Sequence, residues 1–279
     1  MNLIPRPEHP RPQFERADWL NLNGEWSFTF DFGKSGMEAG RELFRSHGFE
    51  GRIIVPFCPE SALSGVRHTD FIEAMWYHRR LQVPAGWAAK RVLLHFGAVD
   101  YESEVFIDGK SVGIHFGGAV SFVWDITRYV QPGSEHHLVV RVADELRPIG
   151  RQPGGKQSHR FKSSGCHYTR TTGIWQTVWL EAVDLSGLRD VQIISDIDGG
   201  RFVFVPAFYA EEHGLRLTVT TNTGEAISVP ATGGVPISLP LRAPQTWSPS
   251  SPFLYDLEFT LNNSEGRERD RVRSYCGLR

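Results

Sequence analysis

Residues 105–114 read VFIDGKSVGI, and this stretch decides the fold class. Val105-Phe106-Ile107 favours an extended strand, because β-branched and aromatic side chains suit a pleated, half-buried surface. Asp108-Gly109 follows directly, and this pair suits the two-residue hairpin turn whose central residues need positive φ. Apolar residues resume shortly afterwards, at Val112 and Ile114. The stretch therefore predicts a β-hairpin.

Apolar residues also alternate with a period of two on both sides of this hairpin. Residues 26–32 alternate aromatic with polar side chains, residues 75–83 form a longer strand, and residues 174–180 form a strand that is apolar on nearly both faces. Turn residues separate such segments, which indicates a sandwich or a barrel. Residues 37–47 are the one helix candidate. We therefore expect an all-β protein.

The sequence pattern changes near residues 184–187, which read DLSG. Beyond them, apolar segments predict six or seven strands in about 95 residues, at 191–193, 202–204, 215–219, 227–229, 237–239 and 257–261. This size and strand density are typical of an immunoglobulin-like sandwich. We therefore expect two domains, residues 1–184 and residues 185–279.

Composition excludes several classes of function. The formal net charge of −2 provides no basic field for nucleic acid or anionic lipid. Cys58, Cys166 and Cys276 are far apart and odd in number, so they indicate no disulfide framework. Residues 1–7 lack the apolar segment of a signal peptide, and no apolar run reaches the roughly 20 residues of a membrane helix. We expect a cytoplasmic protein with no nucleic-acid or membrane partner, no metal site and no cofactor.

Eight short blocks carry the most specific pattern in the chain. They are Leu22–Phe28 (LNGEWSF), Val55–Gly65 (VPFCPESALSG), Trp76–Arg80 (WYHRR), Leu94–Tyr101 (LHFGAVDY), Gly113–Gly118 (GIHFGG), Phe122–Thr127 (FVWDIT), Gly155–Gln157 (GKQ) and Thr172–Glu181 (TGIWQTVWLE). In this order and spacing they resemble the sugar-binding domain of glycoside hydrolase family 2. Residues 247–257 and 272–279 resemble the end of the second sandwich of the same family.

The resemblance implies a galactose-binding-like jelly roll, then an immunoglobulin-like sandwich, then a catalytic (β/α)8 barrel. A barrel needs roughly 250 residues, and the 279 residues here are filled by the two sandwiches. Retaining hydrolysis needs two carboxyl groups about 5–5.5 Å apart. The family supplies both as barrel glutamates, one directly after an asparagine, and no Asn-Glu pair occurs here. We assign no catalytic residue and expect the isolated chain to be inactive.

The function implied is that of the N-terminal, non-catalytic region of an enzyme that hydrolyses β-linked O-glycosides. β-Galactosidase is the first expectation, and β-glucuronidase and β-mannosidase follow. The partners implied are a carbohydrate and the catalytic barrel, and a homo-oligomer is left open. Two alternatives also stay open: a free-standing carbohydrate-binding module, and an assembly domain that uses the surface meant for the barrel.

In family enzymes, a loop before the strand that begins at Thr172 reaches over the barrel mouth. Some members place an aspartate six residues before the glycine, where this chain has His167. A histidine can still hydrogen-bond a sugar hydroxyl. The candidate sugar-binding residues are His167, Tyr168, Arg170, Glu60, Lys156 and Gln157.

Each candidate also has a structural interpretation. His167 can be an ordinary exposed loop histidine, and Tyr168 and Arg170 share that alternative. For Glu60 we favour a structural role, as the ion-pair partner of Arg79 or Arg80. Most of the eight tryptophans lie on alternating strands and are expected in the core, with Trp87 as the one expected to be exposed.

Overall fold

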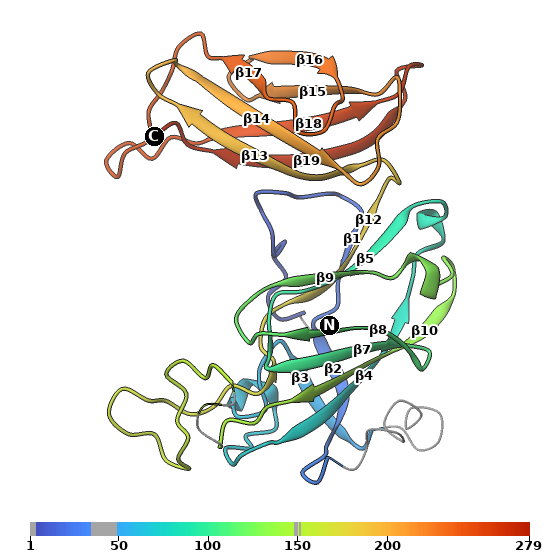
Figure 1. Ribbon diagram of the computed structural model, residues 1–279, viewed down its shortest axis with the longest axis vertical. Coiled ribbons are helices and arrows are strands. Elements are labelled where there is room, and N and C mark those ends of the chain that lie inside the picture. The colour runs from blue at the N-terminus through green and yellow to red at the C-terminus, as the bar shows by residue number, and fades with distance from the viewer. Residues whose placement is uncertain (1–3, 35–48, 148–149, 151) are drawn as a thin grey trace. The chain divides into compact units, whose positions relative to one another are not determined.

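The computed structural model describes residues 4–34, 49–147, 150 and 152–279 (Figure 1). Contacts divide the chain into two compact units, one formed by the residues up to Glu8 together with Trp19–Glu181, and one formed by His9–Asp18 together with Ala182–Arg279. The helix predicted at residues 37–47 lies outside the described residues. None of the helices in the described part has the length and apolar character needed to cross a bilayer.

The first unit is a jelly-roll sandwich, as the resemblance implies. Its sheets have the strand orders β3-β2-β4-β10-β7-β8 and β1-β12-β5-β9, with a two-stranded sheet β11-β6. The strands are β1 (Trp19–Asn21), β2 (Gly24–Phe30), β3 (Gly51–Val55), β4 (Ala74–Gln82), β5 (Arg91–Phe96), β6 (Val99–Asp100), β7 (Glu102–Ile107), β8 (Lys110–Phe116), β9 (Phe122–Asp125), β10 (Glu135–Ala143), β11 (Gly173–Ile174) and β12 (Val178–Val183). Three 3-10 turns join them: η1 (Ala62–Ser64), η2 (Ala85–Trp87) and η3 (Thr127–Tyr129).

The hairpin predicted from residues 105–114 is confirmed as β7 and β8. Ile107 pairs with Lys110 across the turn, and Asp108 and Gly109 have φ values of 49° and 79°. Both central residues are thus in the left-handed region. A two-residue hairpin turn requires this region if its twist is to match that of the flanking strands. Aspartate tolerates this region better than most residues, and glycine adopts it freely.

The inner face of the six-stranded sheet buries large side chains from alternate positions. Trp26 on β2 and Tyr77 on β4 are almost fully buried and meet edge to face, with ring centroids 6.4 Å apart. The prediction of one continuous strand at residues 174–180 is wrong in one respect, because this segment is divided between β11 and β12. β11 pairs with β6 and β12 pairs with β1. The chain therefore changes sheets between Ile174 and Val178.

The second unit is the smaller sandwich, and its seven strands agree with the six or seven expected. It has a three-stranded sheet β13-β14-β17 and a four-stranded sheet β16-β15-β18-β19. The strands are β13 (Leu188–Asp196), β14 (Arg201–Phe208), β15 (Arg216–Thr221), β16 (Ala226–Pro230), β17 (Ile237–Pro240), β18 (Tyr255–Asn262) and β19 (Glu268–Cys276). Phe202 and Phe204 of one sheet pack edge-on against Tyr255 and Phe259 of the other.

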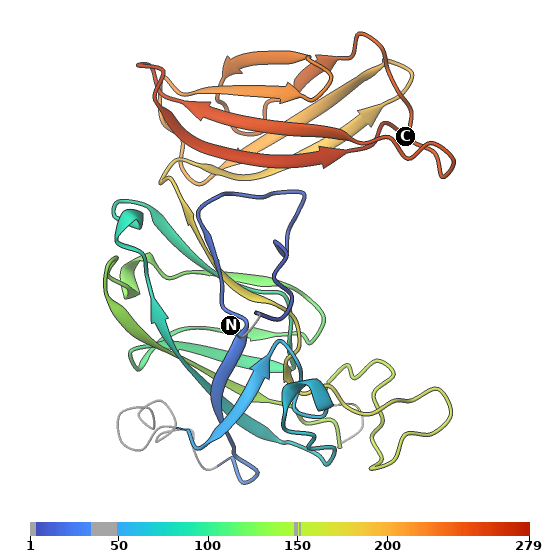
Figure 2. The same cartoon turned by 180° about the vertical axis from the view of Figure 1, so that it is seen from behind.

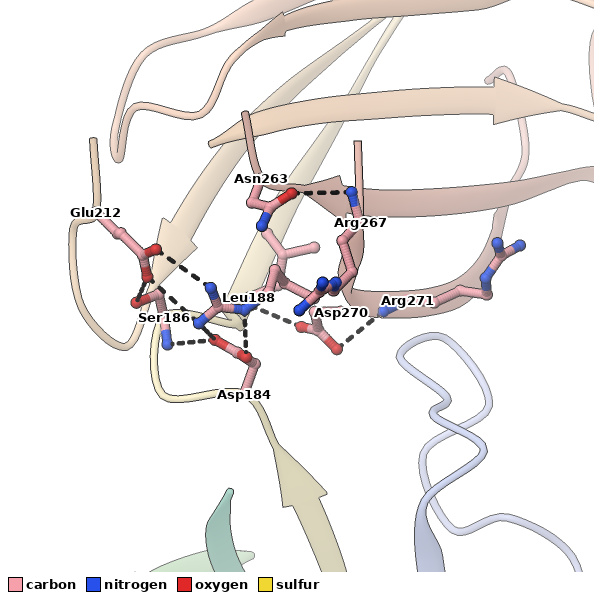
Figure 3. Close-up of polar contacts among 9 residues, drawn as sticks. Asp184, Ser186, Leu188, Glu212, Asn263, Arg267, Asp270 and Arg271 are labelled. Atoms are coloured by element: carbon pink, nitrogen blue, oxygen red, sulfur yellow. Dashed lines mark hydrogen bonds and ion pairs between the residues drawn. The ribbon is translucent and has the colours of Figure 1, made fainter. Parts of the chain in front are cut away.

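Residues 9–18 form a strap that belongs to the second unit, a feature that the sequence pattern does not reveal. Phe14 is buried in that unit's core. Arg16 makes a bidentate ion pair with Asp270, at 2.8 Å and 2.9 Å, and both side chains are buried. The backbone N–H of Leu188 also donates to Asp270 (Figure 3). One carboxylate thus ties the strap to the start of β13.

A second polar cluster lies at the start of the second unit. Ser186 donates to Asp184 through its backbone and to Glu212 through its hydroxyl (Figure 3). The Arg269 guanidinium donates to both acidic side chains. The contact-based boundary, between Glu181 and Ala182, falls three residues before the boundary expected from sequence.

Candidate functional site

The longest irregular segment of the first unit joins β10 to β11, and its described part includes residues 152–172 (Figures 1 and 2). Isolated bridges join Gln157 to Tyr168 and Ser164 to His167. A segment of this length without strands is usually functional when it is ordered. Three buried carboxylates of the sandwich hold it in place.

These carboxylates are Glu60, Asp100 and Asp144; two of them stand at strand ends, and Glu60 lies in the turn that follows a strand. Glu60 lies between β3 and η1, Asp100 is the last residue of β6, and Asp144 follows β10 directly. All three are buried. Strand ends place polar groups at the rim of a sandwich, where loops can cover them.

The loop supplies hydrogen-bond donors to all three carboxylates. Gln152 donates to Asp144 at 2.6 Å, and Gln157 donates to Asp100 at 2.7 Å. Thr172 donates through its backbone N–H to both oxygens of Glu60, each at 3.2 Å, and through its hydroxyl to Asp144 at 2.9 Å. Buried carboxylates without such donors would be strongly unfavourable. The loop therefore supplies hydrogen bonds to all three carboxylates and is fixed by them, although Oδ1 of Asp100 has no hydrogen-bond partner among the described residues.

Arg170 holds the loop together through hydrogen bonds from its buried side chain. Its buried guanidinium donates to the backbone carbonyls of Arg160 at 2.5 Å and Phe161 at 3.2 Å, and also to that of Thr69. It also lies over the Phe71 ring, with 4.4 Å between Cζ and the ring centroid. Arginine suits this role because its planar fork presents several donors in fixed directions.

Burial changes the acidity of this cluster. It raises the pKa of Asp100 to about 7, with the nearby Asp144 carboxylate adding to the effect and the Gln157 hydrogen bond opposing it. Burial also raises the pKa of Glu60 to about 6 and raises the pKa of Asp144. The cause in each case is the loss of water around a charged group. Perturbed carboxyl groups beside a loop mark a candidate functional site.

The structure divides the six candidate residues into two groups. His167, Tyr168 and Lys156 are exposed on the loop, where their side chains can meet a ligand. Glu60 and Arg170 are buried, and Gln157 is half-buried; all three are engaged in holding the loop. The second group thus holds the loop in place, and the first group is exposed on its surface.

Two expectations from the sequence are wrong. Glu60 does not pair with Arg79 or Arg80, because Arg79 donates to the carbonyls of Leu22 and Asn23 and Arg80 pairs with Glu135. Trp87 is not exposed: only 5% of its surface is accessible, because η2 turns the ring into the sandwich.

The sequence reasoning missed Asp100 and Asp144 as members of the site. A usable signal was present, since each aspartate follows an apolar strand directly, in FGAVD and in VVRVAD. Their meeting depends on β6 and β10 ending at the same rim, which sequence spacing does not show. Among the described residues, no three metal-binding side chains converge in a way that could hold an ion.

Two family models match the chain in the order expected. "Glycosyl hydrolases family 2, sugar binding domain" covers residues 62–181, and "Glycosyl hydrolases family 2" covers residues 207–279. The chain belongs to glycoside hydrolase family 2. It corresponds to the N-terminal region of these enzymes, with a sugar-binding domain and an immunoglobulin-like domain.

Relatives of this family include enzymes of two specificities. A β-glucuronidase from Paenibacillus borealis is 25% identical, over 93% of this chain and 45% of its own length. A β-galactosidase from Thermoanaerobacter pseudethanolicus is 24% identical, over 88% of this chain and 33% of its own length. The chain thus spans less than half the length of these relatives.

Solved structures agree with the fold. The β-glucuronidase of Ruminococcus gnavus superimposes with a TM-score of 0.73 at 19% identity, covering 94% of this chain and 45% of its own chain. The β-glucuronidase of Lactobacillus rhamnosus gives 0.72 at 20% identity, over 95% of this chain and 45% of its own. At this identity the likeness shows the fold alone.

Proposed function

We propose that this chain is the non-catalytic half of a retaining family 2 glycosidase, and that its 152–172 loop helps to hold the sugar at a catalytic barrel. The observation that carries the proposal is the division of the loop: contacts of the half-buried Gln157 and the buried Arg170 fix it, while His167 and Tyr168 remain exposed. A rigidly held loop with free polar tips is suited to positioning a ligand.

The chemistry of cleavage would come from the barrel. Glu60, Asp100 and Asp144 are buried, and each accepts at least one hydrogen bond from the loop. A carboxylate in that state cannot reach an anomeric carbon or a leaving oxygen. The role we propose for them is to hold the loop, while the barrel supplies the acid/base and the nucleophile.

For the substrate we propose a β-galactoside, with a β-glucuronide as the second candidate. The β-galactosidase of T. pseudethanolicus supports the first. The second is favoured by the P. borealis relative and by the R. gnavus β-glucuronidase, whose structure was also solved with D-glucuronic acid. His167 suits either sugar, since an imidazole can both donate to and accept from a hydroxyl. We propose the cytoplasm as the compartment.

The test is to read and express the coding region that contains this chain, extended past Arg279. We expect an open frame of roughly 250 residues with an Asn-Glu pair, and an enzyme that cleaves p-nitrophenyl β-galactoside faster than the β-glucuronide. His167→Ala should then raise KM more than it lowers kcat. A stop codon directly after Arg279, or an extended protein without glycosidase activity, would contradict the proposal.

A further inference from the structure

The outer face of the six-stranded sheet carries a cavity that the loop tips do not use. Val105, Val140 and Tyr77 point into the core of the sandwich. Because side chains alternate along a strand, their neighbours Glu102, Glu104 and Arg141 point outwards. The cavity has a volume of about 550 Å³ and is lined by Lys34, Tyr101, Glu102, Phe116, Arg141, Ala143, Glu145 and Gln152. This volume is in the range of small-molecule sites, which is about 300–1,000 Å³.

Arg141 provides an unused hydrogen-bond donor in this lining. Its side chain is buried, with 6% of the residue's surface accessible. One terminal nitrogen donates to Glu102 at 3.0 Å, while the Nε–H has no acceptor among the residues that the structure describes. A buried donor without an acceptor is unfavourable. A ligand hydroxyl that entered the cavity, with a small shift of the guanidinium, would supply the missing acceptor.

Phe116 provides an apolar platform at the same place. It is 61% exposed at the end of the edge strand β8, where its backbone pairs with Glu102. Tyr101, a second aromatic residue, also lines the cavity. An exposed phenyl ring beside a carboxylate and a guanidinium is a suitable surface for a pyranose, whose C–H face is apolar and whose edge carries hydroxyls.

The charge of the lining selects the class of ligand. Its two cations, Lys34 and Arg141, are paired with Glu145 and Glu102 respectively. Among the described residues of the lining, positive and negative charges are therefore balanced, which leaves no excess positive charge there to compensate a carboxylate or a phosphate. This balance favours a neutral sugar over an anionic one.

We propose that this cavity binds a neutral hexopyranose unit of a glycan, with Phe116 stacking on the ring and Arg141 and Glu102 hydrogen-bonding its hydroxyls. This site is separate from the exposed loop residues His167 and Tyr168. It does not depend on a barrel, so it can be tested on the 279-residue chain itself.

A second cavity adjoins the first and extends the proposed binding site. It has a volume of about 370 Å³ and shares Lys34 and Glu145 with the first; its other lining residues are Phe71, Glu73, Asp144, Leu146 and Arg147. The Lys34–Glu145 ion pair thus stands between two cavities of sugar-binding size. We expect a disaccharide to occupy both and to bind more tightly than a monosaccharide.

The experiment is an NMR titration of the whole chain with methyl β-D-galactopyranoside, lactose and sodium D-glucuronate. We expect saturable shifts at the amides of β7, β8 and the end of β10 with the two neutral sugars, tighter binding of lactose, and weak or no binding of glucuronate. Phe116→Ala should weaken lactose binding roughly tenfold or more. Arg141→Lys, which keeps the pair with Glu102 but removes the Nε–H, should weaken it as well.

The matched control is Phe32→Ala, a phenylalanine with 51% of its surface exposed that lies outside the 152–172 loop and does not line either cavity. It should bind lactose like the unmodified chain, and thermal unfolding should show that every variant is folded. Absence of saturable shifts, equal binding of glucuronate, or unchanged binding by folded Phe116→Ala would overturn the inference. None of these outcomes bears on whether an extended enzyme cleaves glycosides, so the two proposals fail separately.

Discussion

Asp100 is a buried acid whose pKa lies near neutrality, at about 7. In the unfolded chain an aspartate has a pKa of about 3.9. The folded state therefore binds more protons than the unfolded state between about pH 4 and pH 7, and its stability falls as pH rises through that window. Below the window the carboxyl is neutral in both states and this cost is absent.

Asp100→Asn tests this directly. The amide stays neutral, and its oxygen can still accept from Gln157. We expect the variant to be more stable than the parent at about pH 8, with the difference shrinking towards about pH 5, because one unit of pKa shift corresponds to about 1.4 kcal/mol. Urea unfolding followed by tryptophan fluorescence is a suitable measurement, since seven of the eight tryptophans lie in the first unit. The control is Asp70→Asn, an exposed carboxylate; a pH-independent difference for Asp100→Asn would refute the account.

At position 118, next to the Asp100 carboxylate, there is no room for a side chain larger than that of glycine. A Cβ at this position would lie 2.1 Å from Oδ1 of Asp100, and the carbonyl of Gly118 accepts from the Trp175 indole at 2.6 Å. Gly118→Ala must therefore displace a buried group. We expect it to cost about 1–3 kcal/mol of unfolding free energy. Gly86→Ala, where a Cβ meets open space, should change stability little; similar costs for both variants would be inconsistent with this explanation.

At the scale of elements, the 152–172 loop depends on Arg170 more than on any strand pairing. Arg170→Gln cannot reach all of the carbonyls that the guanidinium holds. We expect faster amide hydrogen exchange over residues 158–168, with strand amides unchanged, because local opening follows local contacts. Arg160→Gln, at an exposed position of the same loop, is the control. Unchanged exchange in Arg170→Gln would show that the loop is held by other contacts.

For the second unit, we predict that the strap of residues 9–18 depends on its buried ion pair. Asp270→Asn leaves Arg16 as a buried charge with a weakened partner. Breaking such a pair from one side costs about 3–5 kcal/mol, and we expect a loss of this order, measured by hydrogen exchange in β13 and β19. Asp190→Asn removes the exposed pair with Arg11 and should cost less than about 1 kcal/mol. Equal effects would contradict the importance of burial.

The elements that could be predicted from sequence are those whose signals are local. The Asp108-Gly109 turn, the alternation in β2 and β18, and the long strand β4 follow from neighbouring residues, and they are confirmed. The strap and the break between β11 and β12 could not be predicted, because each depends on a partner far away in sequence: Asp270 for the strap, and β6 and β1 for the break. The same holds for the candidate site. The sequence motifs predict the loop residues, whereas only the folded structure shows that Asp100 and Asp144 hold the loop.

At the scale of the whole molecule, the chain has the two β units of family 2 enzymes and carries its buried carboxylates as loop supports. An enzyme of this family needs a facing acid and nucleophile about 5–5.5 Å apart. Our central claim is that these two units contribute binding and positioning, while bond cleavage requires a barrel.

The most direct test of that claim is an activity assay on the purified 279-residue chain with p-nitrophenyl β-galactoside and β-glucuronide, near pH 6 and near pH 8. The account predicts no release of p-nitrophenol above the buffer rate at either pH. Release that co-purifies with the folded chain, and that disappears in Asp100→Asn or Glu60→Gln, would contradict it.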